Sequence, residues 1–393
     1  MLFVALFPVL SQIFSEKFSS EQLATLSYSL FWIGFIARPL GALMLSPIGD
    51  KKSRKKLLVI SVIGMSFATL LMGCVPFGSS PTLTIVFIAI LRLCQGFFTG
   101  IEFSAATIYV FENSSHDSLL STQKYQNILI MGMMTTLGMA LAYFLAALCQ
   151  LEMVAVLSFW RAAFILTGFL GLWIGILRLT RLPDDYHKVS ALNTVADQSY
   201  SLKECLPIFF LIGISYGPFY YISTFLNTYS VVLKKEDAFL ALLFNTGICL
   251  FYTFVIFIIF KMASGLFYKK KYISFYHILF IFCLAPLSAV IFNTDSLLLS
   301  FVCQAILIFI SQLIVSHINV NVLNFFPPCF RVRGYSLIQT LAASCLGGVA
   351  PLICHWLAVS CESRFYAVIY PIGLTILSFK SYKILQNKFK ENI

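Results

Sequence analysis

Apolar stretches close to twenty residues long recur along the whole chain, separated by short polar and charged segments. Because a helix of about 20 apolar residues crosses the hydrocarbon core of a bilayer, each stretch predicts a membrane span. The first is Met1–Phe14, and later ones are predicted at about 23–48, 57–76, 82–111, 127–149, 155–179, 205–227, 238–260, 272–292, 297–324, 335–358 and 365–382. The pattern predicts an all-α integral membrane protein, a bundle of about 12 transmembrane helices.

The longest polar interruption lies near the middle of the chain, at about Thr180 to Glu204. It predicts a six-helix half at residues 1–179, a cytoplasmic linker at 180–204 and a second six-helix half at 205–393 that ends in a short tail. Many membrane carriers are built from two such halves.

Lysine and arginine gather in the loops after the even-numbered spans and in the tail. These residues are Lys51, Lys52, Arg54, Lys55, Lys56, Lys124, Arg178, Arg181, Lys188, Lys203, Lys261, Lys269, Lys270, Lys271, Arg331, Arg333, Lys380, Lys383, Lys388 and Lys390. The opposite loops hold only Lys17, Lys234, Lys235 and Arg364, with Arg161 at their edge. The positive-inside rule therefore predicts a multi-pass protein of the bacterial inner (plasma) membrane with its C-terminus in the cytoplasm.

Composition excludes several classes of protein. Apolar residues make up 59% of the chain and charged residues 11%, against about 25% charged in soluble domains. The net charge of +11 comes from the loop clusters, so it orients the chain in a bilayer and does not predict nucleic-acid binding. The eleven cysteines form no C-x-x-C pair and are interpreted as packing residues, so no metal or cofactor is expected. Without a P-loop or an H-E-x-x-H motif, we do not expect an enzyme.

Three ionisable residues inside the predicted spans are functional candidates: Arg38, Arg92 and Glu102. An ionised side chain at the centre of a membrane helix costs roughly 2.5 to 3.5 kcal/mol on insertion scales. In the fourth span, Arg92, Gln95, Thr99 and Glu102 fall within about 80° of one another around the helix. This polar stripe is expected to face the interior of the bundle or a water-filled cavity. The alternative is that Arg92 and Glu102 have structural roles. For Arg38, the alternative is that its side chain ties helix ends together.

A second polar stripe is predicted in the tenth span. Its residues are Gln304, Ser311, Gln312 and Asn319, with His317 to one side. Such a face is suited to lining a solute pathway. His317 is a candidate proton relay, because histidine ordinarily changes charge near neutral pH, although a lone helical histidine is more often a hydrogen-bonded packing residue.

Four sequence motifs resemble a known family. Residues 37–56, ARPLGALMLSPIGDKKSRKK, resemble the R-P-x-G helix and G-D-x-x-G-R-K-K loop of the major facilitator superfamily. Residues 92–112, RLCQGFFTGIEFSAATIYVFE, are similar to the R-x-x-Q-G-x-x-x-G-G-E stretch of its metabolite:proton symporter branch, which contains the proline/betaine transporters. Residues 160–164, WRAAF, resemble the W-R-x-P-F opening of the sixth helix, and residues 326–351 resemble the F-P-x-x-x-R-x-x-G and G-G-x-x-P run.

The resemblance implies roles for several residues. Asp50 and Arg54 would belong to a cytoplasmic gating loop, Arg92 and Gln95 to a fourth-helix motif associated with proton coupling, and Glu102 to the acidic position of the branch. The sequence departs from the family pattern at Ser46, Ser53, Ile101 and Ala163. Its first span offers about 14 apolar residues, or roughly 21 Å, so either the true start lies upstream or the carrier is shortened.

These features predict a secondary active transporter that works by alternating access. We expect proton-coupled uptake of a small zwitterionic or carboxylate solute, such as a proline/betaine-like osmolyte or an organic acid. Arg92 would hold a substrate carboxylate or modulate a nearby proton site, and Glu102 would carry the proton. The expected partners are the solute, protons or sodium, and lipid, with no nucleic acid and no required oligomer. The alternative is a shortened, uncoupled facilitator or channel, or a solute-sensing membrane protein.

Overall fold

A computed structural model describes residues 20–75, 81–113, 120–149, 159–183, 202–226, 238–262, 272–327 and 330–391. Every secondary-structure element within these ranges is helical, and eleven helices are long and apolar enough to cross a membrane. They are Tyr28–Lys51, Arg54–Gly73, Leu83–Asn113, Gln123–Leu148, Arg161–Arg181, Cys205–Phe225, Phe239–Lys261, Ile273–Asn293, Leu297–Phe325, Arg331–Ser360 and Arg364–Gln386. These helices match every predicted span after the first to within a few residues. The predicted all-helical membrane bundle is therefore confirmed, and Met1–Phe14 lies outside the described residues.

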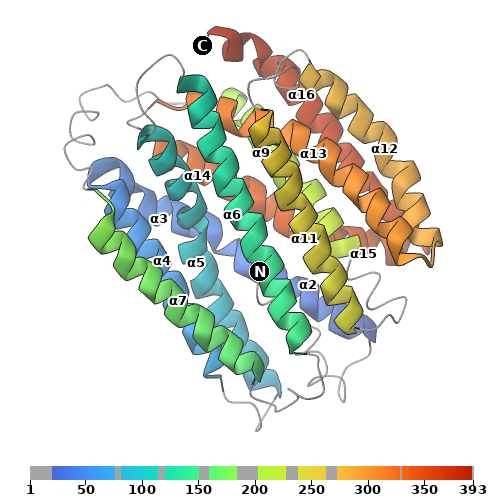
Figure 1. The fold of residues 1–393 in the computed structure, drawn as a ribbon, viewed down its shortest axis with the longest axis horizontal. Coiled ribbons are helices and arrows are strands. Elements are labelled where there is room, and N and C mark those ends of the chain that lie inside the picture. Colours follow the sequence, from blue (N-terminus) through green and yellow to red (C-terminus); the bar gives the residue numbers. More distant parts are fainter. Residues whose placement is uncertain are drawn as a thin grey trace. The chain divides into compact units, whose positions relative to one another are not determined.

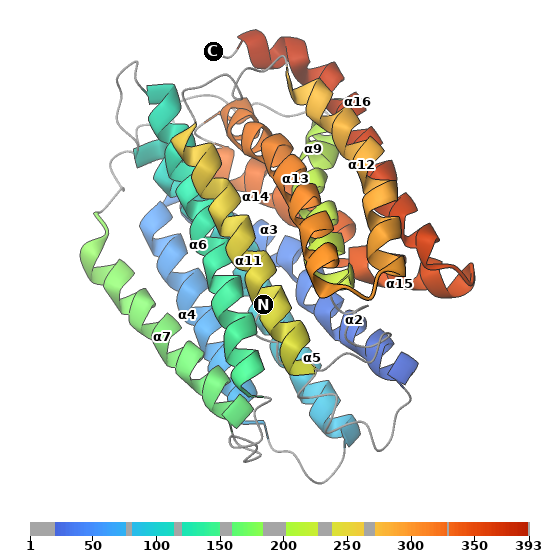
Figure 2. The same ribbon diagram turned by 45° about the vertical axis from the view of Figure 1, so that its right-hand side comes forward.

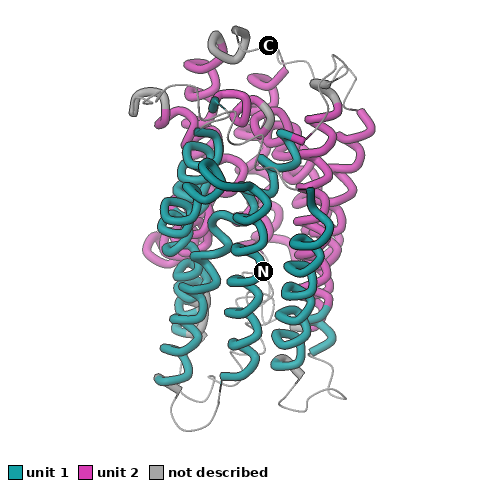
Figure 3. Tube along the Cα trace, turned by 90° about the vertical axis from the view of Figure 1, so that its left-hand side faces the viewer, with its two compact units in different colours: residues 1–112, 145–199, 326–344 teal, residues 113–144, 200–325, 345–393 magenta. Residues whose placement is uncertain are grey.

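The chain forms two compact units, shown in Figure 3. Unit 1 comprises residues 1–112, 145–199 and 326–344, and unit 2 comprises residues 113–144, 200–325 and 345–393. The units follow spatial contact and not sequence order, because a short segment near the C-terminus joins unit 1. The division at residues 180–204 into two six-helix halves stays a prediction.

The helices are labelled in Figures 1 and 2. Those of unit 1 are α2 (Ser20–Ile36), α3 (Arg38–Lys51), α4 (Arg54–Gly73), α5 (Pro81–Asn113), α7 (Phe159–Arg181) and α14 (Arg331–Ala342). Those of unit 2 are α6 (Leu120–Leu148), α9 (Leu202–Tyr220), α11 (Ala238–Lys261), α12 (Ile273–Asn293), α13 (Leu297–Phe325), α15 (Ala350–Ser360) and α16 (Ile369–Glu391), with the last residues of α6 counted in unit 1. Unit 2 also holds η2 (Tyr221–Phe225) and η7 (Arg364–Val368), and η6 (Ala343–Gly348) joins α14 to α15.

The second predicted span is broken into α2 and α3 by a proline. Pro39 has no backbone N–H to donate to the carbonyl of Phe35, four residues earlier, so that carbonyl needs another donor. The hydroxyl of Ser344, which follows α14, donates to Phe35 O at 2.7 Å. The break thus creates the acceptor through which a residue 309 positions later is attached.

Glycines let α5 approach α2 and α3 closely. A Cβ atom built on Gly96 would lie closer than 3.0 Å to the carbonyl of Gly34, and one on Gly100 would clash in the same way with the carbonyl of Arg38. Gly41 of α3 makes the reciprocal approach to the carbonyl of Phe97. Small residues at helix crossings are typical of membrane bundles, where association depends on close packing.

A second glycine seam joins α7 to α4, which lie side by side in Figures 1 and 2. Gly168 packs on Leu70, Gly171 on Ser66 and Gly175 on Ile63. On the opposite face of α7, large apolar side chains are exposed, such as Phe169 at 59% and Trp173 at 60%. Such a face is suited to lipid and would be unfavourable in water.

Aromatic packing dominates unit 2. The ring of Phe301 on α13 contacts Phe244 and Phe251 of α11 at centroid distances of 5.8 and 6.0 Å. Phe219 of α9 meets Tyr252 of α11 edge to face at 5.1 Å. These contacts join three helices around an interior that is largely apolar.

We expect Gly100→Ala to destabilise the protein by about 1 to 3 kcal/mol, because the added methyl group meets the backbone of α3 and no flexible side chain can yield. Thermal unfolding in detergent measures the effect. Gly138→Ala is the matched control, since no atom lies within 4 Å of a Cβ there. That control should be neutral or gain about 0.5 to 1 kcal/mol. Equal unfolding temperatures for the two variants would contradict the close crossing.

Candidate functional site

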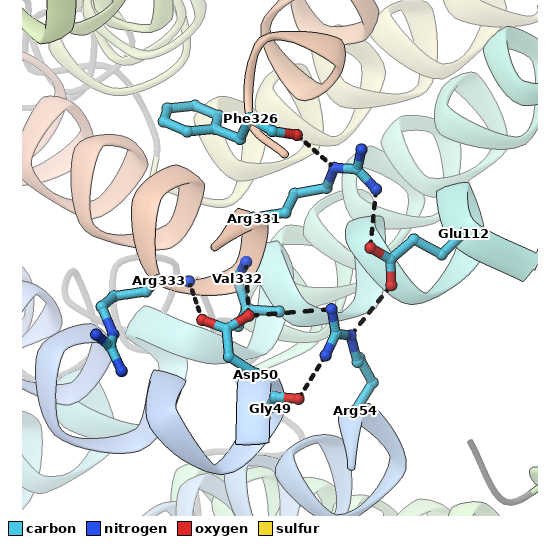
Figure 4. A network of polar contacts seen from close by, with 8 residues as sticks. All are labelled: Gly49, Asp50, Arg54, Glu112, Phe326, Arg331, Val332 and Arg333. Carbon is cyan, nitrogen blue, oxygen red and sulfur yellow. Dashed lines mark hydrogen bonds and ion pairs between the residues drawn. The ribbon is translucent and has the colours of Figure 1, made fainter. Parts of the chain in front are cut away.

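The carboxylate of Asp50, at the end of α3, caps the N-terminus of α14 (Figure 4). The backbone N–H of Val332 donates to Oδ1 at 3.2 Å, and that of Arg333 donates to Oδ2 at 3.0 Å. The N-cap residue of α14 itself, Phe330, provides no side-chain cap. An anion here also interacts favourably with the helix dipole. A residue 282 positions earlier thus satisfies donors that the local sequence leaves open.

Arg54 is the first residue of α4 and is almost fully buried, with 2% of its surface exposed. Its guanidinium donates to the carbonyl of Gly49 at 2.7 Å and lies 3.9 Å from Asp50 Oδ1. Ser53 caps α4 by accepting a hydrogen bond from the N–H of Lys56 at 3.2 Å, so this departure from the family glycine has a local structural use.

Glu112, near the end of α5, bridges two arginines (Figure 4). Its Oε2 accepts from Arg54 Nε at 3.1 Å, and its Oε1 accepts from Arg331 at 2.8 Å. Arg331 also donates to the carbonyl of Phe326 at 3.1 Å. One carboxylate thereby connects α4, α5 and α14.

The gate cluster, which we define as Asp50, Arg54, Glu112 and Arg331, concentrates four charges where little solvent screens them. Removing one partner from such a buried network typically costs about 3 to 5 kcal/mol, because the remaining charge is left uncompensated. Gly49 permits the close approach, since a Cβ there would lie 2.7 Å from Leu57 and 3.1 Å from Val332. The cluster can therefore act as a latch that holds only while these helix ends stay together.

The polar stripe of α5 faces α4. Arg92 is 7% exposed and donates to Gln95 Oε1 at 2.6 Å, and Gln95 Nε2 donates to Thr69 of α4 at 2.8 Å. The guanidinium lies beside Gly34 of α2, where a Cβ would make an ordinary van der Waals contact with Arg92 Cζ at 3.5 Å. Thr99 donates to the carbonyl of Gln95 at 2.7 Å.

Glu102 lies two turns further along the same face and has different partners. Arg178 of α7 donates to Glu102 Oε1 at 2.5 Å, and Ser61 of α4 donates to Oε2. The side chain of Glu102 is 15% exposed. The side chain of Glu102 therefore joins α5 to α4 and α7.

The remaining predicted residues are spread over both units. In unit 1, Arg38 lies 3.5 Å from the ring centroid of Phe35, as in a cation–π interaction. In unit 2, His317 is 4% exposed and its ring lies 6.3 Å from that of Tyr276, while Gln312 is half-buried on the same helix. Among the residues that the structure describes, no group of three or more His, Cys, Asp or Glu could hold a metal ion.

Sequence reasoning did not single out several partners as site residues. Glu112 and Arg331 complete the gate cluster, Arg178 neutralises Glu102, and Thr69 and Ser61 of α4 receive the α5 stripe. Glu112, Arg331 and Arg178 each lie within a few residues of a helix end, and this position was the one feature of the sequence that could have indicated them. Nothing in the spacing indicated which charges would meet.

A bundle of membrane-spanning helices with these motif residues at the helix ends defines a membrane transporter of the major facilitator type. The chain matches the Major Facilitator Superfamily over residues 1–351 and belongs to that family.

Relatives and solved structures agree with this assignment. A chain of Staphylococcus aureus (strain COL), named as a candidate proline/betaine transporter, is 25% identical over 93% of this chain and 80% of its own. The proline/betaine transporter of Escherichia coli (strain K12) is 38% identical over 21% of this chain and 17% of its own. The proton:xylose symporter XylE superposes with a TM-score of 0.72 at 12% identity, over 98% of this chain and 92% of that one, which shows the fold alone.

We expect Asp50→Asn to loosen the first turn of α14, because one amide oxygen replaces two charged acceptors. Losing such a cap typically costs about 0.5 to 2 kcal/mol. Hydrogen exchange read by mass spectrometry should show faster exchange at Val332 and Arg333. Lys52→Gln, which alters an exposed charge two residues away, is the control and should exchange as the unaltered protein does. Unchanged protection of α14 in Asp50→Asn would refute the capping role.

Proposed function

We propose that the protein imports a small zwitterionic or carboxylate solute together with a proton across a bacterial inner membrane. Membership of the family supports a transporter, and the name of the S. aureus relative, which aligns over 93% of this chain, supports a proline- or betaine-like solute. Transport would use alternating access, in which the solute pathway opens to one side of the membrane at a time.

The observation that carries the proposal is the polar face of α5. Two charged residues, Arg92 and Glu102, are retained inside a helix that is otherwise apolar enough to cross a membrane. Intramembrane charges are expensive and are usually kept for function. Arg92 remains protonated at any working pH, so its proposed role is to hold a solute carboxylate or to modulate a proton site.

Glu102 is the proposed proton carrier. Among the acidic residues in the described spans, Asp50 and Glu112 lie within two residues of a helix end, whereas Glu102 lies well inside α5. A carrier must lose and regain its charge in each cycle. Protonating Glu102 would remove the attraction of Arg178 and free α7 from α5, so proton binding would alter packing within unit 1.

The gate cluster is the proposed conformational latch. Its ion pairs and the Asp50 cap stabilise one arrangement of α3, α5 and α14. A transporter must break such contacts in each cycle, so the latch can be worth only a few kcal/mol if both states are to be populated.

We expect Glu102→Gln to abolish solute accumulation driven by a pH gradient while leaving exchange of solute across the membrane without a gradient. Glutamine keeps the size and a hydrogen bond to Ser61 but cannot release a proton. Uptake and exchange of labelled proline in proteoliposomes provide the measurement. Asp295→Asn, which neutralises an exposed carboxylate between α12 and α13, is the control and should accumulate normally. Normal accumulation by Glu102→Gln would make the carboxylate structural and direct attention to His317 or sodium coupling.

We also expect both the tail after Lys380 and the segment around Arg181 to face the cytoplasm, because the basic residues of the loops gather on that side. Reporter fusions at Asn387 and Leu192 that are active only in the cytoplasm would measure this. A fusion at Lys234 should report the opposite side. Activity of either of the first two reporters outside the membrane would reverse the proposed orientation.

A further inference from the structure

Two buried amide side chains in unit 2 stand out because their polar atoms are not satisfied. Gln304 of α13 is 0% exposed, and neither its Nε2 nor its Oε1 has a hydrogen-bond partner among the described residues. Asn245 of α11 is 6% exposed, and its Oδ1 likewise lacks a partner within the described part of the chain. An unsatisfied buried group typically costs about 1 to 3 kcal/mol, so three such atoms require a reason.

The two amides lie along one seam between α11 and α13. Phe301 of α13 packs between Phe244 and Phe251 of α11, which sets the register of the two helices. Asn245 follows Phe244, and Gln304 is three residues beyond Phe301, so in two helices running in the same direction both amides point to the same side of that contact. Figures 1 and 2 show α11 and α13 side by side.

The register places the two amides at different heights. Along the helix axes, Asn245 lies on the N-terminal side of the level of Phe301 and Gln304 lies on its C-terminal side. At 1.5 Å per residue, the two amides are roughly 8 Å apart along the axis. That distance exceeds a direct hydrogen bond between two short amide side chains. It suits a solute of a few heavy atoms with one polar group for each amide.

The seam carries no net charge. The only Asp, Glu, Lys or Arg on α11 or α13 is Lys261, at the end of α11. Tyr252, two turns beyond Asn245 on α11, is 0% exposed and packs edge to face on Phe219. An ion with a net charge would be left uncompensated there, whereas a zwitterion is neutral as a whole.

We propose that Asn245 and Gln304 form a solute-binding subsite that selects an amino- or imino-acid zwitterion with N–H donors over a fully N-methylated betaine. The two unsatisfied oxygens must receive hydrogen bonds, and the single NH₂ group must find an acceptor. A secondary ammonium supplies two N–H donors, and its carboxylate supplies the acceptor. A quaternary ammonium has the same charge but no donor, so it would leave both oxygens unpaired.

This subsite rests on the proposed transport function and names its solute class. The test uses the full chain in nanodiscs, with L-proline and N,N-dimethyl-L-proline as probes in equilibrium binding. The two molecules share a skeleton and a zwitterionic charge, and in the analogue two N-methyl groups replace the two N–H donors. We expect the unaltered protein to bind L-proline at least about tenfold more tightly than its dimethyl analogue.

Asn245→Leu should weaken L-proline binding by about tenfold and leave binding of the dimethyl analogue unchanged, because Asn245 would act only as an acceptor for N–H donors. Gln304→Leu should weaken L-proline binding by at least about tenfold and also weaken binding of the analogue, because both carboxylates lose the Gln304 NH₂ donor. Gln304→Leu should also unfold at the same or a higher temperature, because it removes unsatisfied groups from an apolar site, so lost binding would not reflect lost folding. Thr246→Val is the control, since the Thr246 hydroxyl already bonds to Leu242 O of its own helix at 2.9 Å.

Three results would overturn the proposal: no binding of L-proline, equal binding of the two probes by the unaltered protein, or unaltered L-proline affinity in both leucine variants. Failure of the proposed proton coupling would look different. In that case L-proline would still bind with the expected preference but would not accumulate under a pH gradient, and the subsite would be supported.

Discussion

The carboxylate of Asp50 provides the N-terminal cap that the local sequence of α14 lacks. Its two hydrogen bonds hold α14 against the end of α3 in unit 1. Two backbone donors of α14 and one buried carboxylate would each be costly alone, so they stabilise one another. The other end of the segment is attached by Ser344, which bonds to the carbonyl that Pro39 leaves open on Phe35. Both ends of α14 are thus held by the broken helix pair α2 and α3, and Arg54, Glu112 and Arg331 reinforce the first end.

The motif on α5 combines packing and chemistry on adjacent faces of one helix. Gly96 and Gly100 bring the helix against α2 and α3, where only hydrogen atoms fit. One residue earlier, Gln95 turns toward Thr69 of α4, and Glu102 reaches Ser61 two turns further on. Close backbone approach on one side therefore fixes the orientation of the polar side chains on the other.

Under the two proposals, the units have different chemistry. Unit 1 holds Arg92, Glu102 and the gate cluster, whose charged groups have hydrogen-bonding or ion-pair partners, and these suit proton exchange and gating. The seam of unit 2 between α11 and α13 has amides, hydroxyl groups and aromatic rings, which suit recognition of a neutral zwitterion. A fixed charge near the solute would attract one end of a zwitterion and repel the other. Uncharged polar groups instead distinguish solutes by the number of hydrogen bonds that each solute can form with them.

The sequence by itself determined the spans, because lipid requires long apolar helices and only segments near twenty apolar residues satisfy that requirement. It also determined which intramembrane residues are unusual, since Arg92, Glu102 and Gln304 are conspicuous in apolar surroundings. Tertiary structure decided the partners: Asp50 caps a helix 282 residues away, Arg178 neutralises Glu102, and α14 packs with helices of the other predicted half. Hydrophobic pattern reports only whether a residue is buried in lipid or protein. Which polar group meets which depends on helix register and close approach, and both are set by the packing of segments far apart in the chain.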